Sequence, residues 1–174
     1  MCLMDQEVNS NKLEAIYQMG EELYHQDLSG LDMSEIELND ISFKGLDLRY
    51  VNFENSVLVS VNFVGADLGA INLKGVKLEN CDFSKANLRW AQLTGTEMHN
   101  CKFVGTNMLE SDFSEALLKN VDFSYADLRR CMFRNAVLTD VDLYNANISR
   151  ADFRGSDIDE IRNISSYTYG TTWE

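Results

Sequence analysis

A five-residue hydrophobic period dominates the chain between residues 31 and 158. Every fifth residue from Met33 to Ile158 is Leu, Phe, Met or Ile, which gives 26 consecutive blocks with one apolar centre each. The residue two positions before each centre is mostly small or β-branched, and the residue between them is mostly polar. Alternate residues of an extended segment point to the same side, so each block predicts one short strand with an apolar inner and a polar outer surface. An α-helix, with about 3.6 residues per turn, would rotate such a stripe off one face.

Bends are predicted between the strands. Glycine or asparagine stands two positions after the centre in many blocks, as at Gly45, Gly65 and Asn80. These residues tolerate the left-handed backbone that tight turns require. The repeat therefore predicts very short strands joined by regular bends.

A longer period lies inside the shorter one. All nine phenylalanines occupy alternate centres, at positions ending in 3, and the other centres are Leu, Met or Ile. Several sets recur every 20 residues, including Asn80 with Asn100 and Cys81 with Cys101. This spacing favours a coil of four sides per 20 residues, although the ten-residue alternation alone would also fit two sides. In a coil of four sides, the residues predicted to stack in core columns include Phe43, Phe63, Phe83, Phe103 and Phe123 on one side and Leu48, Leu68 and Leu88 on the next.

The two ends differ from the repeat. Residues 1–10 are polar and are predicted to be disordered. Residues 11–24 carry an apolar stripe with helical spacing, which predicts an α-helix that caps the first coil. The β-helix is expected to span residues 25–160, with an irregular first block around Leu28. Residues 161–174 form a polar and aromatic tail that is expected either to cap the last coil or to mediate dimerisation.

Composition narrows the classes of function. The chain of 174 residues has a net charge of −13, which argues against direct binding to nucleic acid or to an anionic membrane and favours a basic partner. It lacks a long apolar run and a signal peptide, so a cytoplasmic location is expected. Its four cysteines are too few and too irregular for a disulfide framework or a zinc site, and Cys81 and Cys101 are expected to be buried free thiols.

No catalytic grouping emerges from the sequence. His25 and His99 lie in different regions, and neither has a nucleophile or carboxylate placed to complete a triad. The glycines follow the bend positions and form no phosphate-binding loop. We therefore expect no enzymatic activity, no cofactor and no metal.

Charge is unevenly distributed over the four sides. The side that begins at Ile36 has eight acidic and two basic residues, and the side that begins at Leu46 has four acidic and five basic residues. The latter side includes the aromatic residues Tyr50 and Trp90, and its five basic residues are Arg49, Arg89, Arg129, Arg130 and Arg150. The candidate acidic binding surface consists of Glu37, Asp40, Asp157, Asp159 and Glu160.

Blocks such as CDFSKANLRWAQLTG and VDFSYADLRRCMFRNAVLTD resemble the A(D/N)LXX motif of the pentapeptide-repeat family. The resemblance covers about residues 31–160 and implies a right-handed, quadrilateral parallel β-helix of about 6.5 coils, roughly 31 Å long. Members of that family include inhibitors or protectors of DNA gyrase that are thought to mimic DNA and to dimerise through their C-terminal ends.

Two functions are consistent with these features. The first is a non-enzymatic scaffold whose flat faces, two of them acidic, bind an unidentified protein. The alternative is a DNA mimic that binds DNA gyrase or another topoisomerase.

Overall fold

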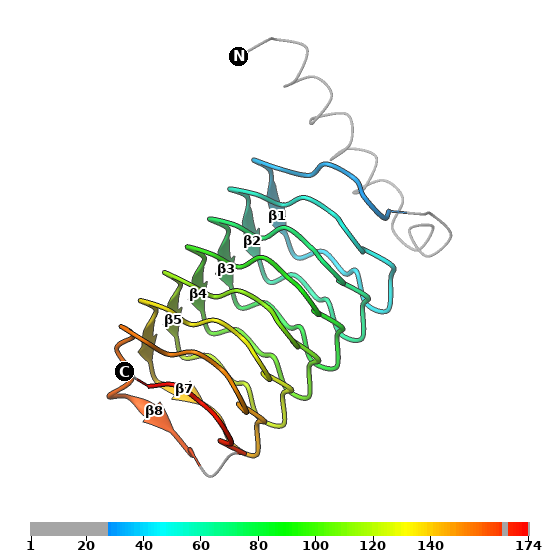
Figure 1. Cartoon of the computed structure of the whole chain (residues 1–174). Helices are drawn as coiled ribbons and strands as arrows, with labels where there is room; N and C mark the ends of the chain where they lie inside the picture. Colours follow the sequence, from blue (N-terminus) through cyan, green and yellow to red (C-terminus); the bar gives the residue numbers. More distant parts are fainter. Residues whose placement is uncertain (1–27, 165–166, 174) are drawn as a thin grey trace.

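The computed structural model describes residues 28–164 and 167–173, which form a parallel β-solenoid (Figure 1). Six strands, one from each successive turn, form a single parallel sheet in the order β1-β2-β3-β4-β5-β6. A second sheet of two strands pairs β7 with β8. The strands are β1 (Glu37–Asn39), β2 (Val57–Val59), β3 (Lys77–Glu79), β4 (Glu97–His99), β5 (Leu117–Lys119), β6 (Val137–Thr139), β7 (Val141–Asp142) and β8 (Ile161–Arg162). The all-β parallel solenoid predicted from the sequence is confirmed.

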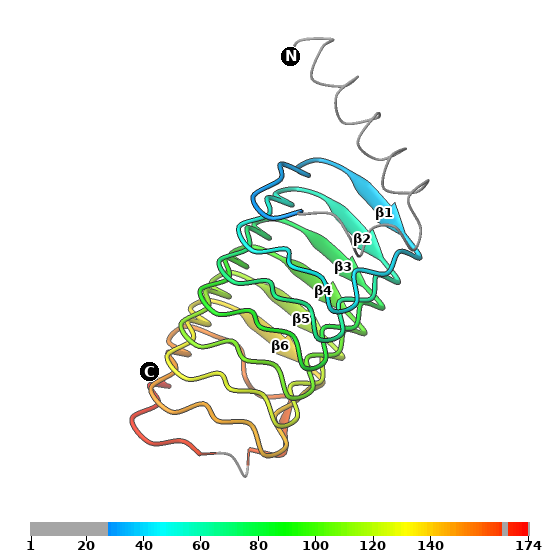
Figure 2. The ribbon, with the colours of Figure 1, turned by 90° about the vertical axis from the view of Figure 1, so that its right-hand side faces the viewer.

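Each turn of the solenoid contains 20 residues. In the six-stranded sheet Leu38 pairs with Leu58, and the same step relates every later pair of strands. Isolated bridges keep this step on the other sides, as between Asn62 and Asp82. We name the four outer faces by their strands or first centres: the β-sheet face (β1–β6), the Phe43 face, the Leu48 face and the Met33 face. Figure 2 shows the strands of the β-sheet face lying side by side along the solenoid.

Residues with a left-handed backbone conformation form the corners between the faces. Gly65 has a φ of 68°, but the same conformation occurs at Trp90 (60°) and Arg150 (63°), which have full side chains. On the Phe43, Leu48 and Met33 faces, the backbone carbonyl of the central apolar residue of most blocks accepts a hydrogen bond from the backbone N–H three residues later. The Phe63 carbonyl, for example, accepts from Ala66 at 3.0 Å. The corner residue also donates to the next turn, as Trp90 does to Leu109 at 3.1 Å. These bonds hold the left-handed backbone, so corners are not restricted to glycine and asparagine.

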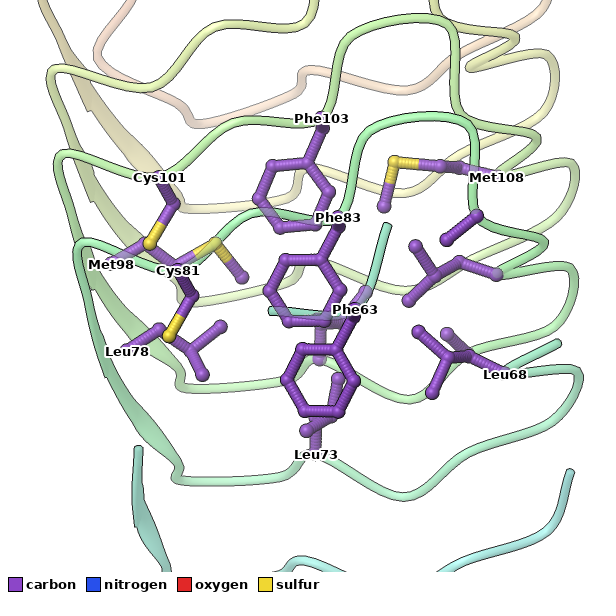
Figure 3. Packing of buried hydrophobic residues seen from close by; sticks show 14 of the residues in the cluster. Phe63, Leu68, Leu73, Leu78, Cys81, Phe83, Met98, Cys101, Phe103 and Met108 are labelled. Atoms are coloured by element: carbon purple, nitrogen blue, oxygen red, sulfur yellow. The ribbon is translucent and has the colours of Figure 1, made fainter. Parts of the chain in front are cut away.

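Stacked aromatic rings fill the interior (Figure 3). The rings of Phe63, Phe83 and Phe103 lie nearly parallel, with centroids 4.6 and 4.7 Å apart. A second column belongs to the Met33 face, where Phe133 stacks on Phe153 at 4.7 Å. The two columns contact each other edge to face, a favourable geometry for aromatic pairs. All eight predicted core-column residues are fully buried: Phe43, Phe63, Phe83, Phe103, Phe123, Leu48, Leu68 and Leu88.

Three cysteines also belong to the interior. Cys81, Cys101 and Cys131 are buried free thiols, and Figure 3 shows the first two in successive turns. The neighbouring Cys81 thiol and burial both raise the pKa of Cys101 above the ordinary value of a thiol. Burial likewise raises the pKa of Cys131. The raised pKa values keep the Cys101 and Cys131 thiols protonated, and all three cysteines pack as small residues of the core.

The C-terminal part of the chain departs from the sequence-based interpretation. The five-residue hydrophobic period ends at Ile158, yet the 20-residue register continues beyond it. Tyr167 pairs with Asn147, and the Trp173 ring stacks on Phe153 with centroids 4.8 Å apart. The described part of the predicted tail therefore adds backbone pairing and one aromatic ring to the solenoid. The predicted disordered segment 1–10 and the predicted capping helix 11–24 lie outside the described residues.

Candidate functional site

The outer faces of the described residues present the side chains that a partner could contact. Their side chains include no group of three or more His, Cys, Asp or Glu placed to hold a metal ion. His99 lies exposed on β4, and the three described cysteines are buried. In this part of the chain no helix is long and apolar enough to cross a membrane. The outer faces differ from one another in their charged and apolar side chains.

The structure places the predicted acidic surface at both ends of the β-sheet face. Glu37 and Asp40 lie in the turn of β1, and Asp157, Asp159 and Glu160 lie six register steps further along. All five side chains are exposed. At about 4.8 Å per step, the two groups are separated by about 29 Å. They share a face but do not form one continuous patch.

Apolar side chains lie on the β-sheet face between its acidic ends. Val57 and Val59 are half-buried on β2, while Leu117 and Val137 are 47% and 39% exposed on β5 and β6. Between these pairs Lys77 on β3 and Glu97 on β4 form an ion pair at 3.4 Å. The face is thus a flat sheet with two small apolar areas on either side of a neutralised charge pair.

An amide ladder follows the corner between the β-sheet face and the Phe43 face. The Asn100 side-chain amide donates to the Asn80 carbonyl oxygen at 3.2 Å, and Asn120 donates to Asn100 at 2.9 Å. Each amide therefore links one turn to the next. Ladders of this kind stabilise the stacking of successive strands.

Arginine–aspartate pairs lie on two turns of the Leu48 face. Arg49 donates from Nε and Nη2 to the two carboxylate oxygens of Asp47 at 2.9 and 2.6 Å, and Arg129 binds Asp127 in the same way at 2.7 and 2.6 Å. The hydrogen bond from Arg49 holds the pKa of Asp47 below its usual value, although partial burial opposes the effect. These side chains are ordered by pairing with each other along the face.

An aromatic and charged ridge marks the corner between the Leu48 and Met33 faces. The Arg89 guanidinium lies 4.4 Å from the Trp90 ring centroid, and the Trp90 indole donates to Glu110 at 3.2 Å. Arg130, one turn further on, donates to the other Glu110 oxygen at 2.7 Å. The bonds from Arg130 and then Trp90 lower the pKa of Glu110. Interactions between turns therefore stabilise this corner as well as the interior.

A hollow lies beside this ridge near the C-terminal end. Its volume is about 420 Å³, and its lining consists of Leu109, Arg129, Arg130, Ser149, Arg150 and Tyr169. The arginines are apparent from the sequence as members of one side, but the hollow is not. Tyr169 lies beyond the five-residue hydrophobic period, and only extension of the 20-residue register aligns it with Leu109 and Arg129.

A second, smaller arginine cluster lies on the Met33 face. Arg134 and Arg154 both donate to the Asp152 carboxylate at 2.6 Å. The hydrogen bond from Arg154, reinforced by Arg134, holds the pKa of Asp152 well below its usual range. Both guanidinium groups are therefore engaged by one carboxylate.

Family models for pentapeptide repeats match two adjoining parts of the chain. A model of eight repeat copies matches residues 36–75, and a pentapeptide-repeat-region model matches residues 71–153. The chain belongs to the pentapeptide-repeat family. A comparison with curated proteins found no match. The 20-residue turns of stacked Phe and Leu centres are thus those of a pentapeptide-repeat protein.

Solved pentapeptide-repeat structures share the architecture. HetL, a protein involved in heterocyst differentiation regulation from the cyanobacterium Nostoc sp. strain PCC 7120, is 19% identical, with 91% of each chain covered and a TM-score of 0.57. A trypsin-treated variant of QnrB1, a plasmid-mediated fluoroquinolone resistance protein, is 16% identical, with 84% of this chain and 83% of that chain covered and a TM-score of 0.52. At these identities the likeness shows the fold alone.

Proposed function

We propose that this pentapeptide-repeat protein is a non-enzymatic scaffold that binds a protein partner through its flat outer faces. The observation that carries the proposal is the β-sheet face, where six short strands in one register present exposed Leu117 and Val137 on a flat surface. Apolar residues surrounded by charged ones are the usual composition of a protein interface. Acidic residues at both ends of the face would favour a partner with basic residues around its apolar contact.

Rigidity supports the same function. Backbone hydrogen bonds join each turn to its neighbours, and the stacked interior leaves the outer side chains on a fixed framework. A surface that is already ordered loses little conformational entropy when it binds. We also propose a cytoplasmic location, which is consistent with the free thiols of Cys81 and Cys101 because reducing compartments preserve thiols.

Affinity capture from the source organism tests the scaffold function. The wild-type protein should retain a specific partner, and the double variant Leu117→Lys/Val137→Lys should lose it because it places two charges on the apolar part of the face. The control Ser42→Lys/Gln92→Lys adds the same charge at exposed outward positions of the Phe43 and Met33 faces, and it should retain the partner. Equal capture by all three proteins would contradict binding through the β-sheet face.

The second candidate is a DNA mimic that binds DNA gyrase or another topoisomerase. The acidic ends of the β-sheet face favour it, as does the overall charge of −13. Residues 31–160 contain 21 acidic and 13 basic residues, a net charge of −8 over roughly 31 Å. Duplex DNA has about one charge per 1.7 Å, which is more than twice this density. Lys77, Lys119 and the arginines of the Leu48 face also interrupt the acidity, so mimicry ranks second.

A supercoiling assay distinguishes the mimic from the scaffold. If the protein is a mimic, it should inhibit gyrase supercoiling, and the variant Glu37→Gln/Asp40→Asn/Asp157→Asn/Asp159→Asn should relieve the inhibition. The Ser42→Lys/Gln92→Lys protein raises the net charge by two, whereas the neutralised variant raises it by four, and it controls for this part of the change in net charge. Absence of inhibition at tens of micromolar would exclude the mimic and leave the scaffold proposal.

We further propose a homodimer formed through the C-terminal end. Ile164 and Tyr167 expose 45% and 73% of their surfaces there, and a second copy could cover this apolar and aromatic surface. A two-fold axis at this end would cover the same groups on both copies. Light scattering should give the mass of a dimer for the full chain, and deletion of residues 162–174 should abolish the dimer or cause aggregation. A monomeric full chain with a soluble monomeric truncation would contradict dimerisation.

A further inference from the structure

We infer that the hollow on the Leu48 face binds an oxyanion carried by an acidic or phosphorylated protein segment. Its six lining residues come from four successive turns: Leu109, Arg129, Arg130, Ser149, Arg150 and Tyr169. The inference deepens the proposed partner-binding function and rests on it, because the oxyanion would belong to such a partner. It adds a cationic site to a protein whose overall charge is acidic.

The solenoid register assembles the site. Leu109, Arg129, Ser149 and Tyr169 follow one another at 20-residue steps on the Leu48 face, while Arg130 and Arg150 occupy the adjoining corner. The Arg130 backbone donates to the Ser149 carbonyl at 3.1 Å, and the Arg150 backbone donates to the Tyr169 carbonyl at 2.9 Å. The Arg130 and Arg150 guanidinium groups therefore originate from backbone positions that are held by hydrogen bonds between turns.

The arginines retain binding capacity toward a ligand. Arg129 uses Nε and Nη2 to bind Asp127, and Arg130 uses Nη1 to bind Glu110. A guanidinium group has five N–H donors, so donors remain on both side chains. Arg150 forms no ion pair with a carboxylate among the described residues, and its side chain is exposed. Three arginines and two carboxylates thus leave an excess of one positive charge at the hollow.

The neighbouring residues give the site its shape. A Cβ atom at Gly170 would lie only 3.3 Å from Cγ of Arg150, so glycine leaves room for the Arg150 side chain against the last turn. The Ser149 hydroxyl donates to Asn147 Oδ1 at 2.7 Å, which commits its proton and makes Ser149 a small spacer rather than a donor to the ligand. Leu109 and Tyr169 add an apolar and an aromatic wall.

This combination fits a carboxylate or phosphate attached to a larger group. Planar guanidinium groups bind both oxyanions through paired, charge-assisted hydrogen bonds. The Leu109 and Tyr169 side chains can contact the carbon atoms that carry the oxyanion. Because the arginines are about half exposed, we expect weak binding of the free anion and stronger binding of a peptide that also contacts the walls.

NMR spectroscopy of the ¹⁵N-labelled full chain tests the site. Inorganic phosphate is titrated at constant ionic strength, followed by three peptides of one sequence that differ only in a central serine, glutamate or phosphoserine. Phosphate should cause saturable shifts of the signals of residues 129–130, 149–150 and 169–170. Arg150→Gln should weaken this binding about five-fold or more, because it removes a charge-assisted pair.

Arg49→Gln provides the matched control. Arg49 lies on the same face, but its guanidinium binds Asp47 far from the hollow, so its loss should leave phosphate binding unchanged. Binding of both charged peptides, but not of the serine peptide, would identify a carboxylate as sufficient. Binding of the phosphoserine peptide alone would identify a phosphorylated segment as the source.

Non-saturable shifts, equal shifts at arginines throughout the chain, or an unchanged affinity in Arg150→Gln would overturn the site. Binding of phosphate with no response to either charged peptide would overturn the assignment to a protein segment. The partner-capture experiment described above gives a result that does not depend on the phosphate and peptide titrations. A partner that is retained by the β-sheet face while the hollow binds nothing would overturn this inference alone and leave the scaffold function intact.

Discussion

Removal of the Phe83 ring should strongly destabilise the solenoid. The ring is fully buried and lies between Phe63 and Phe103, with centroids 4.6 and 4.7 Å away and interplanar angles of 12° and 3°. Burial of a side chain of this size contributes about 1.5–3 kcal/mol, and each aromatic pair adds about 0.5–1.5 kcal/mol. Phe83→Ala loses both contributions and leaves a gap in the middle of a column. We expect the free energy of unfolding to fall by about 3–5 kcal/mol.

Guanidinium denaturation followed by circular dichroism measures this loss. Tyr50→Ala is the control because it removes another aromatic ring, one that is 66% exposed at a corner, without changing the core. The control should lose less than about 1 kcal/mol, as is usual for surface substitutions. A loss below about 1 kcal/mol in Phe83→Ala would refute the argument that the stacked column stabilises the fold.

Three further predictions concern pH, the C-terminal end and nucleic acid. Asp152→Asn should lower stability at pH 7 by about 1 kcal/mol, because both partners of the carboxylate are surface arginines. The pKa of Asp152 is lowered in the folded state, so the contribution of this carboxylate to stability is present above the unfolded value of about 3.9 and declines as pH falls. The difference in melting temperature between the wild type and the variant should therefore be smaller at pH 2 than at pH 7. An equal difference at both pH values would contradict this linkage. Trp173→Ala should expose the Phe153 ring and lower the melting temperature, and an unchanged value would show that the stack at 4.8 Å contributes no stability. Duplex DNA should not bind at physiological salt, and a gel shift of micromolar affinity would contradict the repulsion expected from the charge of −13.

The repeat allows much of the fold to be predicted because one geometric rule applies to every block. A residue such as Phe83 must fill the same space as Phe63 and Phe103, so the 20-residue spacing in the sequence corresponds to the 20-residue turn of the structure. Each additional turn shows the same spacing and so gives further support to the prediction. Burial of the predicted columns follows from this repetition.

Corners and the chain end were harder to predict for local reasons. Glycine and asparagine indicate a left-handed corner by their own preference, whereas Tyr50 and Trp90 adopt one because hydrogen bonds from adjacent turns hold the backbone there. Near the C-terminus, Asn163 and Thr168 occupy centre positions that are otherwise apolar, which conceals the register that Trp173 resumes.

Surface sites depend on which side chains pair with each other, and the repeat spacing does not predict this pairing. The spacing places Arg129, Arg130 and Arg150 near one another, but it does not show which guanidinium group is engaged by a carboxylate. Pairing of Arg129 with Asp127 and of Arg130 with Glu110 leaves Arg150 as the distinctive member of the hollow. The candidate acidic surface likewise depends on its arrangement, because its residues lie at opposite ends of one face.

Titration of the purified captured partner by isothermal calorimetry tests the scaffold function most directly. We expect a defined stoichiometry for the wild-type protein and at least about a ten-fold weaker affinity for Leu117→Lys/Val137→Lys, since charges on an apolar contact remove more than about 1.4 kcal/mol of binding free energy. The Ser42→Lys/Gln92→Lys protein should bind as the wild type does. Equal affinities for the wild type and the β-sheet-face variant, or a loss confined to the control, would contradict partner binding through the β-sheet face.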